Sequence, residues 1–482
     1  MNLDSDSCYR ALTTHDARFD GRFFVGVTST RIYCRPVCTV RTPRRENCRF
    51  FMSAAAAEVN GFRPCMRCRP ELAPGLASVD ATARLAQGAV DLIENGVLEE
   101  GGLEHLAGRV GVTSRHLRRV FLTEFGVAPI EFAQTQRLLL AKRLLTDTVL
   151  PVTEIALASG FQSVRRFNAL FKSRYRMAPG RLRRERTPGA LPDALRFELA
   201  FRPPYAFDAI LDFLRERAIP AVEAVTAQGY ARTLSLVHRG AIHAGVVEVR
   251  RVPRRMALAV HLSASFARVV PLVLGRVKHS FDLACDPGEI ESQLGPLAAA
   301  HPGLRVPGAF DGFELGVRAI VGQQISVRAA RTLLGRDARA HGRAYEGAAW
   351  SDTAEPARLF PSAAAIADAG ADAIARCGIT PARARSVVAL ARAVASGNLV
   401  LEPGVDVDAT LDRLRALPGV GPWTAHYIAM RALRWPDAFL ANDLVVLRAM
   451  NETRAARAEA ASAAWRPWRA YAVMHLWKGA ST

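Results

Sequence analysis

The cysteines are the residues of this sequence whose types and spacing point most clearly to chemistry. Six of the eight cysteines lie before residue 70, and four of them form two short pairs, Cys34-x3-Cys38 and Cys65-x2-Cys68. In a reducing cytosol such a cluster indicates metal binding or catalysis rather than disulfides. Two short-spaced pairs of thiolates are typical of a tetrahedral zinc site. We therefore expect one Zn²⁺ ion per chain here, and on spacing alone a purely structural site is the simplest interpretation.

The residues around these cysteines add a second indication. The segments YCRPVC (33–38) and GFRPCMRC (61–68) resemble the N-terminal domain of Ada adaptive-response proteins, and the resemblance extends over residues 8–72. It implies that Cys34 accepts a methyl group from a DNA phosphotriester while all four sulfurs hold zinc. A zinc-bound thiolate is deprotonated at neutral pH and still nucleophilic, which suits that role. Neighbouring arginines are expected to contact the DNA backbone: Arg35, Arg63, Arg67 and Arg69.

Two helix-turn-helix patterns follow, in residues 103–125 and 152–175, with Gly111 and Gly160 at the expected turns. The segment GFQSVRRFNALFKSRYRMAPGRLRR closely resembles the second unit of an AraC-type DNA-binding domain, which Ada proteins carry in the same place. The resemblance implies that the second helix of each unit reads the major groove of DNA. The expected recognition residues are Ser114, Arg115, Arg118, Ser163, Arg165, Arg166 and Asn168, and the expected core residues are Phe161, Phe167 and Phe171.

The segment LPGVGPWTA (417–425) lies between two expected helical runs, 411–416 and 423–433. It has the form of a helix-hairpin-helix, in which glycines permit a tight turn whose backbone N–H groups point at a phosphate. Gly419, Val420 and Gly421 are therefore candidates for DNA contact. A hairpin of this kind could equally be a passive DNA-binding module.

Asp443, downstream of the hairpin in the apolar segment FLANDL, favours catalysis over passive binding. A hairpin followed by an aspartate resembles the helix-hairpin-helix glycosylase superfamily. Across residues 195–482 the resemblance is to AlkA-type 3-methyladenine DNA glycosylases, through FDGFELGVRAIVGQQISV, LPGVGPWTAHYIAMRAL and WRPWRAYAVMHLW. It implies that Asp443 stabilises the positive charge that develops on the sugar and helps water to attack. The alternative is a structural aspartate that caps a helix.

The resemblance also assigns a pocket and excludes two activities. Trp423, Tyr427 and Trp477 match pocket aromatics that bind electron-poor flipped bases, and Gln324 matches the side chain that fills the gap in the duplex. Trp423 stands where bifunctional relatives have a lysine, so strand cleavage through an imine is not expected. The Pro-Cys-His-Arg motif of the guanine-repairing Ada domain does not occur in the sequence. We expect no cofactor in the glycosylase half.

These motifs must be positioned by several domains, because 482 residues exceed one average domain. We predict a multidomain, mostly α fold: a small zinc-bound α+β domain, an AraC-type double helix-turn-helix, a small α+β domain with an antiparallel sheet, and an all-α helix-hairpin-helix domain. Strands are expected at 233–238, 245–252 and 257–263. The predicted boundaries are 1–76, 77–186, a linker at 187–194, 195–285 and 286–482.

The formal charge of +19 and the pI near 10.4 favour a polyanionic partner. We expect double-stranded DNA as that partner, with RNA polymerase as a further candidate. No apolar run approaches the roughly 20 residues that a membrane span needs, so we expect no membrane contact. The predicted state is a monomer in the bacterial cytoplasm, associated with the nucleoid.

The leading hypothesis is an alkylation-response protein with a methyl-accepting regulator in front and a monofunctional glycosylase behind. One rival is a transcription regulator whose glycosylase-like half is inert. The other is an active glycosylase whose zinc site is only structural.

Overall fold

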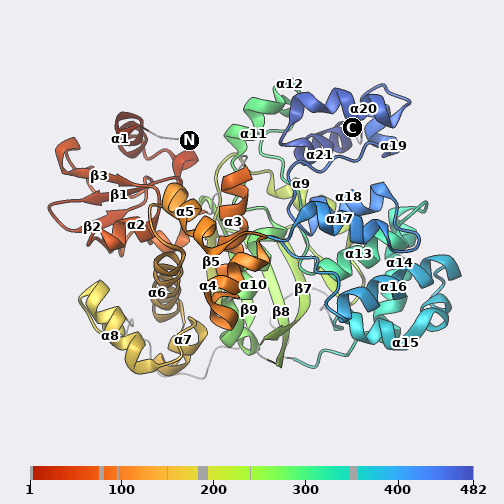
Figure 1. The fold of residues 1–482 in the computed structure, drawn as a ribbon, viewed down its shortest axis with the longest axis horizontal. Coiled ribbons are helices and arrows are strands. Elements are labelled where there is room, and N and C mark those ends of the chain that lie inside the picture. Colours follow the sequence, from red (N-terminus) through yellow and green to blue (C-terminus); the bar gives the residue numbers. More distant parts are fainter. Residues whose placement is uncertain are drawn as a thin grey trace. The chain divides into compact units, whose positions relative to one another are not determined.

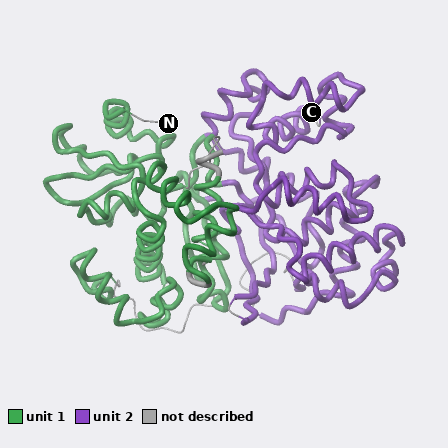
Figure 2. The backbone as a smooth tube through the Cα atoms, in the orientation of Figure 1, with its two compact units in different colours: residues 1–203, 252–275, 283–286 green, residues 204–251, 276–282, 287–482 purple. Residues whose placement is uncertain are grey.

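The computed structural model describes residues 4–74, 81–94, 97–148, 150–182, 194–238, 240–347 and 357–480. These residues divide into two compact units (Figure 2). Unit 1 comprises residues 1–203, 252–275 and 283–286, and unit 2 comprises residues 204–251, 276–282 and 287–482. Most of the expected linker, residues 187–193, lies outside the described residues, as do residues 75–80 at the first predicted boundary.

The N-terminal part of unit 1 is a four-stranded sheet with the strand order β3-β1-β2-β4. Its elements are α1 (Ser5–Thr13), β1 (Phe24–Val27), β2 (Ile32–Cys34), β3 (Cys48–Phe51), α2 (Ala54–Val59) and β4 (Arg63–Pro64). Strands β2 and β4 run parallel, with Tyr33 opposite Pro64. This register places Cys34, the last residue of β2, beside Cys65, which follows β4, although they are distant in the sequence.

The helical part of unit 1 contains both predicted helix-turn-helix units (Figure 1). Its helices are α3 (Ala81–Glu94), α4 (Val97–Arg109), α5 (Ser114–Phe125), α6 (Pro129–Asp147), α7 (Val152–Ala158) and α8 (Val164–Tyr175). Gly111 and Gly160 have φ of +74° and +81° at the turns between the paired helices, a conformation that glycine adopts without steric cost. Phe161, Phe167 and Phe171 are buried, as expected of core residues.

The third segment is the predicted antiparallel sheet, with the strand order β5-β9-β8-β7-β6. Its elements are β5 (Ala194–Ala200), α9 (Phe207–Arg217), β6 (Glu223–Val225), β7 (Gly229–His238), β8 (Ala241–Arg251), β9 (Ala257–Ser263) and α10 (Val270–Ser280). The three predicted strands correspond to β7, β8 and β9, and β7 begins four residues before its predicted start because Tyr230 and Ala231 pair with β6.

The described residues from 287 onward, which belong to unit 2, are mainly helical, and this confirms the predicted fold class. Its helices are α11 (Pro287–Leu294), α12 (Pro296–Ala299), α13 (Gly312–Val321), α14 (Val327–His341), α15 (Ala363–Arg376), α16 (Pro381–Ala395), α17 (Val407–Arg415), α18 (Pro422–Arg431), α19 (Leu444–Ala449), α20 (Ala455–Ala461) and α21 (Arg469–Ala480). Among the described helices, none combines the length and the apolarity that crossing a bilayer requires.

A buried carboxyl group joins the sheet of unit 1 to its helices. Glu58, near the end of α2, is 3 % exposed. Tyr33 donates a hydrogen bond to Glu58 Oε1 (3.1 Å), Tyr175 of α8 donates to the same oxygen (3.4 Å), and Thr135 of α6 donates to Oε2 (3.2 Å). Burial raises the pKa of Glu58 to about 7, and these hydrogen bonds oppose the rise only in part.

This raised pKa predicts a pH-dependent stability. The unfolded carboxyl loses its proton near its ordinary pKa, whereas the folded one keeps it until about pH 7, so raising the pH through this window favours unfolding. As the pH rises from 6 to 8.5, the free energy of unfolding of the wild type should therefore fall by about 1 kcal/mol relative to that of the variant Glu58→Gln. Thermal melts of the two proteins at both pH values, with the exposed variant Glu46→Gln as control, measure this. An unchanged difference at the two pH values would contradict the prediction.

Candidate functional site

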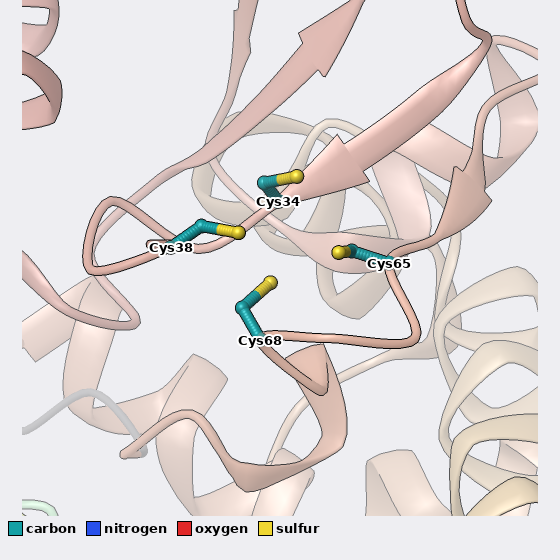
Figure 3. Close-up of side chains that lie close together, drawn as sticks. All are labelled: Cys34, Cys38, Cys65 and Cys68. Atoms are coloured by element: carbon teal, nitrogen blue, oxygen red, sulfur yellow. The ribbon is translucent and has the colours of Figure 1, made fainter. Parts of the chain in front are cut away.

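The four cysteines of the zinc pattern form one cluster in unit 1. Their sulfur atoms all lie within 4.8 Å of one another, and Figure 3 shows them pointing toward a common centre. Cys34 ends β2, Cys38 lies in the turn that follows, Cys65 follows β4, and Cys68 completes the loop after it. None forms a disulfide. Four convergent thiols with three of them buried fit a closed, tetrahedral Zn²⁺ site.

Backbone amides bind some of these sulfurs. The N–H of Arg35 donates to Cys68 Sγ (3.3 Å), and the N–H of Arg67 donates to Cys65 Sγ (3.4 Å). No described backbone N–H donates to Cys34 Sγ. Because a hydrogen bond withdraws charge from a thiolate, the four sulfurs are chemically unequal.

Two of the four arginines expected to contact DNA bind other parts of the protein instead. The Arg35 guanidinium is buried, forms an ion pair with Asp20, and donates to the carbonyl oxygen of Cys68 (3.1 Å). Arg69 forms ion pairs with Glu71 and Asp147. Because both guanidinium groups are engaged within the protein, the structure does not support the expected DNA contact of these two residues. Arg67 is exposed and Arg63 is half-buried, so these two side chains can reach a phosphate.

The recognition residues of the helix-turn-helix units lie on or beside α5 and α8. Those with exposed side chains are Arg115, Arg118, Ser163, Arg165, Arg166 and Asn168, and Ser114 is half-buried. The Ser163 hydroxyl accepts a hydrogen bond from the N–H of Arg166 (3.4 Å) and caps α8. Thr113, which the sequence reading passed over, caps α5 in the same way. The two caps put the units in register, so that Arg115 corresponds to Arg165 and Arg118 to Asn168.

The predicted hairpin of unit 2 lies between α17 and α18. Gly419 has φ of +73°, and a Cβ atom there would lie 2.4 Å from Ser386 Oγ, so only glycine fits. Gly421 caps α18 and is exposed. The side chain of Val420 is buried and its backbone N–H donates to the carbonyl oxygen of Leu417 (3.2 Å), so the contact of Val420 with a phosphate stays a prediction. Gln323 donates to the Gly419 carbonyl oxygen and to Thr424 Oγ1, both at 2.9 Å. These two hydrogen bonds of Gln323, which stabilise the hairpin, were not predicted from the sequence.

Asp443 lies at the start of α19 and binds four N–H groups. Its Oδ1 accepts hydrogen bonds from the backbone N–H of Val445 and of Val446, both at 3.0 Å, so the aspartate caps the helix. The indole N–H of Trp477 also donates to Oδ1 (3.1 Å), and the indole N–H of Trp423 donates to Oδ2 (2.9 Å). The capping role that the sequence left as an alternative is thus present, together with two contacts that a cap does not need.

The three aromatic residues expected in the pocket come together. The ring of Trp423 stacks on that of Tyr427, with centroids 5.1 Å apart and planes 8° from parallel. The ring centroids of Trp477 and Tyr427 lie 6.4 Å apart. Arg431 donates to the Tyr427 hydroxyl (2.6 Å) and to the Pro307 carbonyl oxygen (2.7 Å). Burial alone would raise the pKa of Tyr427, but the positive charge of Arg431, aided by more distant arginines, holds that pKa below its usual value. The role of Arg431 was not predicted from the sequence.

Gln324 lies in the loop between α13 and α14. It is exposed and has φ of +52°, a left-handed conformation that costs a residue with a Cβ atom about 1 to 3 kcal/mol. The role of Gln324 as a side chain that enters the duplex stays a prediction.

Comparison with protein families matches four regions of the chain. Residues 7–71 match the metal binding domain of Ada, residues 106–185 a helix-turn-helix domain, residues 196–311 the AlkA N-terminal domain, and residues 317–469 the HhH-GPD superfamily of base excision DNA repair proteins. Each of the motifs described above falls in one of these ranges, except Trp477, which lies just beyond the last.

Individual relatives match either the whole chain or one half. The "Probable bifunctional transcriptional activator/DNA repair enzyme AlkA" of Mycobacterium tuberculosis is 36% identical over 99% of this chain and 97% of its own. The "DNA-3-methyladenine glycosylase 2" of Escherichia coli is 35% identical over 58% of this chain and 96% of its own. The "Bifunctional transcriptional activator/DNA repair enzyme AdaA" of Bacillus subtilis is 32% identical over 37% of this chain and 82% of its own.

The mycobacterial relative is matched along nearly its whole length, and the four family matches follow one another in the order that the motifs require. The chain therefore belongs to the family of AlkA-type bifunctional transcriptional activators and DNA repair enzymes.

Proposed function

We propose that this chain excises alkylated purines of the 3-methyladenine type from duplex DNA as a monofunctional glycosylase. In the same proposal its front half is a zinc-thiolate methyl acceptor and a transcriptional regulator. The observation that carries the glycosylase is the carboxylate of Asp443, bound by the indoles of Trp423 and Trp477. A carboxylate and aromatic faces at one position are what the hydrolysis of a cationic nucleoside needs.

The chemistry follows from this arrangement. The glycosidic bond breaks, its electron pair leaves with the base, and positive charge develops on the sugar. An alkylated purine that already carries a positive charge leaves as a neutral base, so no general acid is required. Asp443 stabilises the charge on the sugar and accepts a proton from the water that attacks it. The capping N–H groups of Val445 and Val446 fix the orientation of the carboxylate.

The alternative of an inert, DNA-clamping C-terminal half is disfavoured by the same contacts. A cap needs only the two backbone N–H groups, and a clamp needs only the exposed hairpin around Gly419. Neither requires two indoles on one carboxylate.

Methyl transfer to Cys34 is supported by the unequal environment of the four sulfurs. Cys65 and Cys68 accept backbone hydrogen bonds. The pKa of Cys38 is lowered chiefly by the neighbouring Cys34, with a smaller contribution from a backbone hydrogen bond of Val40. Cys34 accepts none from the described backbone, so its thiolate keeps the most charge and is the best nucleophile. One C–O bond of the phosphotriester breaks, an S–CH₃ bond forms, and the phosphodiester leaves as an anion.

The regulatory half binds duplex DNA through the exposed residues of α5 and α8, with RNA polymerase as a candidate partner. We place the chain as a monomer in the bacterial cytoplasm, at the nucleoid. The net charge of +19 supports association with DNA.

The first test replaces the carboxylate. Asp443→Asn should lower the single-turnover rate of methylpurine release from methylated duplex DNA by at least about 100-fold. Asparagine caps helices as well as aspartate does, so α19 should remain folded and the loss should reflect charge. Released bases are measured by chromatography, and circular dichroism reports the fold. Asp412→Asn, an exposed change on α17, is the matched control and should keep the wild-type rate. Equal rates in wild type and Asp443→Asn would refute the catalytic role.

The second test concerns the acceptor cysteine. After incubation with DNA that carries methyl phosphotriesters, mass spectrometry of the digested zinc-loaded protein should find one added methyl group, on the peptide that contains Cys34. Cys8→Ser, outside the cluster, should be methylated like the wild type. Methylation on Cys38, Cys65 or Cys68 would show that hydrogen bonding does not select the acceptor. Loaded, folded protein that gains no methyl group would leave the zinc site as purely structural.

A further inference from the structure

A second group of metal-binding residues lies in unit 2, in a part of the chain that the proposed function does not use. Asp337, His341 and Cys377 each offer one ligand atom, and the three atoms lie within 4.8 Å of one another. Asp337 and His341 are one turn apart near the end of α14, and Cys377 caps the end of α15. Among the described residues, this is the only such group apart from the four cysteines.

The carboxylate of Asp337 is incompletely bound. It is 0 % exposed, and its Oδ1 is 2.7 Å from His341 Nδ1. Its Oδ2 has no hydrogen-bond partner among the described residues. An unpartnered carboxylate oxygen in the interior costs stability unless the group is protonated or binds a cation. Burial raises the pKa of Asp337, with the hydrogen bond from His341 acting against it.

The thiol of Cys377 completes the group. Its side chain is buried, and its sulfur makes only a long contact with the Ala373 carbonyl oxygen, at 3.9 Å. Burial raises the pKa of this thiol and Asp337 adds to the rise, while Arg376 and Arg336 oppose it. Without a metal the thiol therefore keeps its proton, and an ion that binds there must displace it.

We propose that Asp337, His341 and Cys377 form a second metal site, suited to a divalent ion of intermediate softness such as Zn²⁺. Oxygen, nitrogen and sulfur donors together are typical of zinc and unlike the all-oxygen sites of calcium or magnesium. With carboxylate and thiolate ligands the loaded site is neutral overall, which lowers the cost of burying it. Three protein ligands leave the fourth tetrahedral position to water or to another residue.

The ligand atoms need only a small adjustment to bind the ion. Ligand atoms of tetrahedral zinc lie roughly 3.3 to 3.8 Å apart, given the usual metal–ligand distances. The present spread of up to 4.8 Å would contract, and the hydrogen bond between Asp337 and His341 would be replaced by two metal bonds. The ion would join the ends of α14 and α15.

Cobalt binding to the full-length wild-type protein tests the proposal directly. Four thiolates and one thiolate give sulfur-to-cobalt absorption bands of very different intensity, so the two sites are distinguishable. We expect two equivalents of Co²⁺ per folded chain, the second with the weak band of a single thiolate and displaced by Zn²⁺. A single equivalent, or a second one without a sulfur band, would overturn the proposal.

Three variants assign the second ion. Asp337→Asn, His341→Gln and Cys377→Ser should each bind one equivalent, with the four-thiolate spectrum unchanged. His243→Gln, a half-buried histidine on β8, is the matched control and should bind two. Two equivalents in folded Cys377→Ser would place the second ion elsewhere and reject this site. If a variant fails to fold, the wild-type spectrum alone decides the question.

Discussion

The geometry of the candidate C-terminal site depends on one carboxylate and the N–H groups that surround it. Asp443 is bound by the first turn of α19, by Trp423 of α18 and by Trp477 of α21. A hydrogen bond to a charged group contributes about 1.5 to 3 kcal/mol to stability. These hydrogen bonds therefore fix α18, α19, α21 and the two indole rings relative to the carboxylate of Asp443. In the proposed reaction, the same contacts that stabilise the fold would also position the carboxylate at the sugar.

The zinc centre is also assembled by contacts between distant parts of the chain, although its chemistry is different. The parallel register of β2 and β4 brings two distant cysteine pairs together, and the buried pair Arg35–Asp20 holds the loop that carries Cys38. The two sites differ in their state after the reaction. In the proposed function the carboxylate is restored after each turnover, whereas a methylated cysteine is permanent. One half of the chain would then act catalytically, and the other would keep a record of damage. The buried network around Glu58 links Tyr33, the neighbour of Cys34, to Tyr175 of α8.

The sequence predicts features that depend on residues close together in the chain, or on motifs shared with a known family. The cysteine pairs, the turn glycines Gly111 and Gly160 and the LPGVG hairpin each fall within a few residues, so their spacing alone carries the structure. The binding of Asp443 by Trp477 spans 34 residues and could be expected only through the resemblance. The roles of Arg35, Gln323 and Arg431 escaped prediction because their partners, Asp20, Gly419 and Pro307, lie 15, 96 and 124 residues away. Local spacing does not reveal whether a basic or amide side chain faces solvent or a buried partner.

The pocket aromatics bear on how a base is selected. The indole N–H groups of Trp423 and Trp477 are bound to Asp443, and the hydroxyl of Tyr427 is bound to Arg431. With these polar atoms engaged, a flipped base would meet π faces and not a hydrogen-bonding edge. Trp423 and Trp477 would provide these faces, because Tyr427 is buried and stacks on Trp423. A π face attracts an electron-poor or cationic ring, but it does not distinguish the hydrogen-bonding pattern of one purine from another. In the proposed reaction, discrimination would then rest on how readily the base leaves. A cationic alkylated purine departs neutral, while a normal purine would need a proton that these rings do not supply.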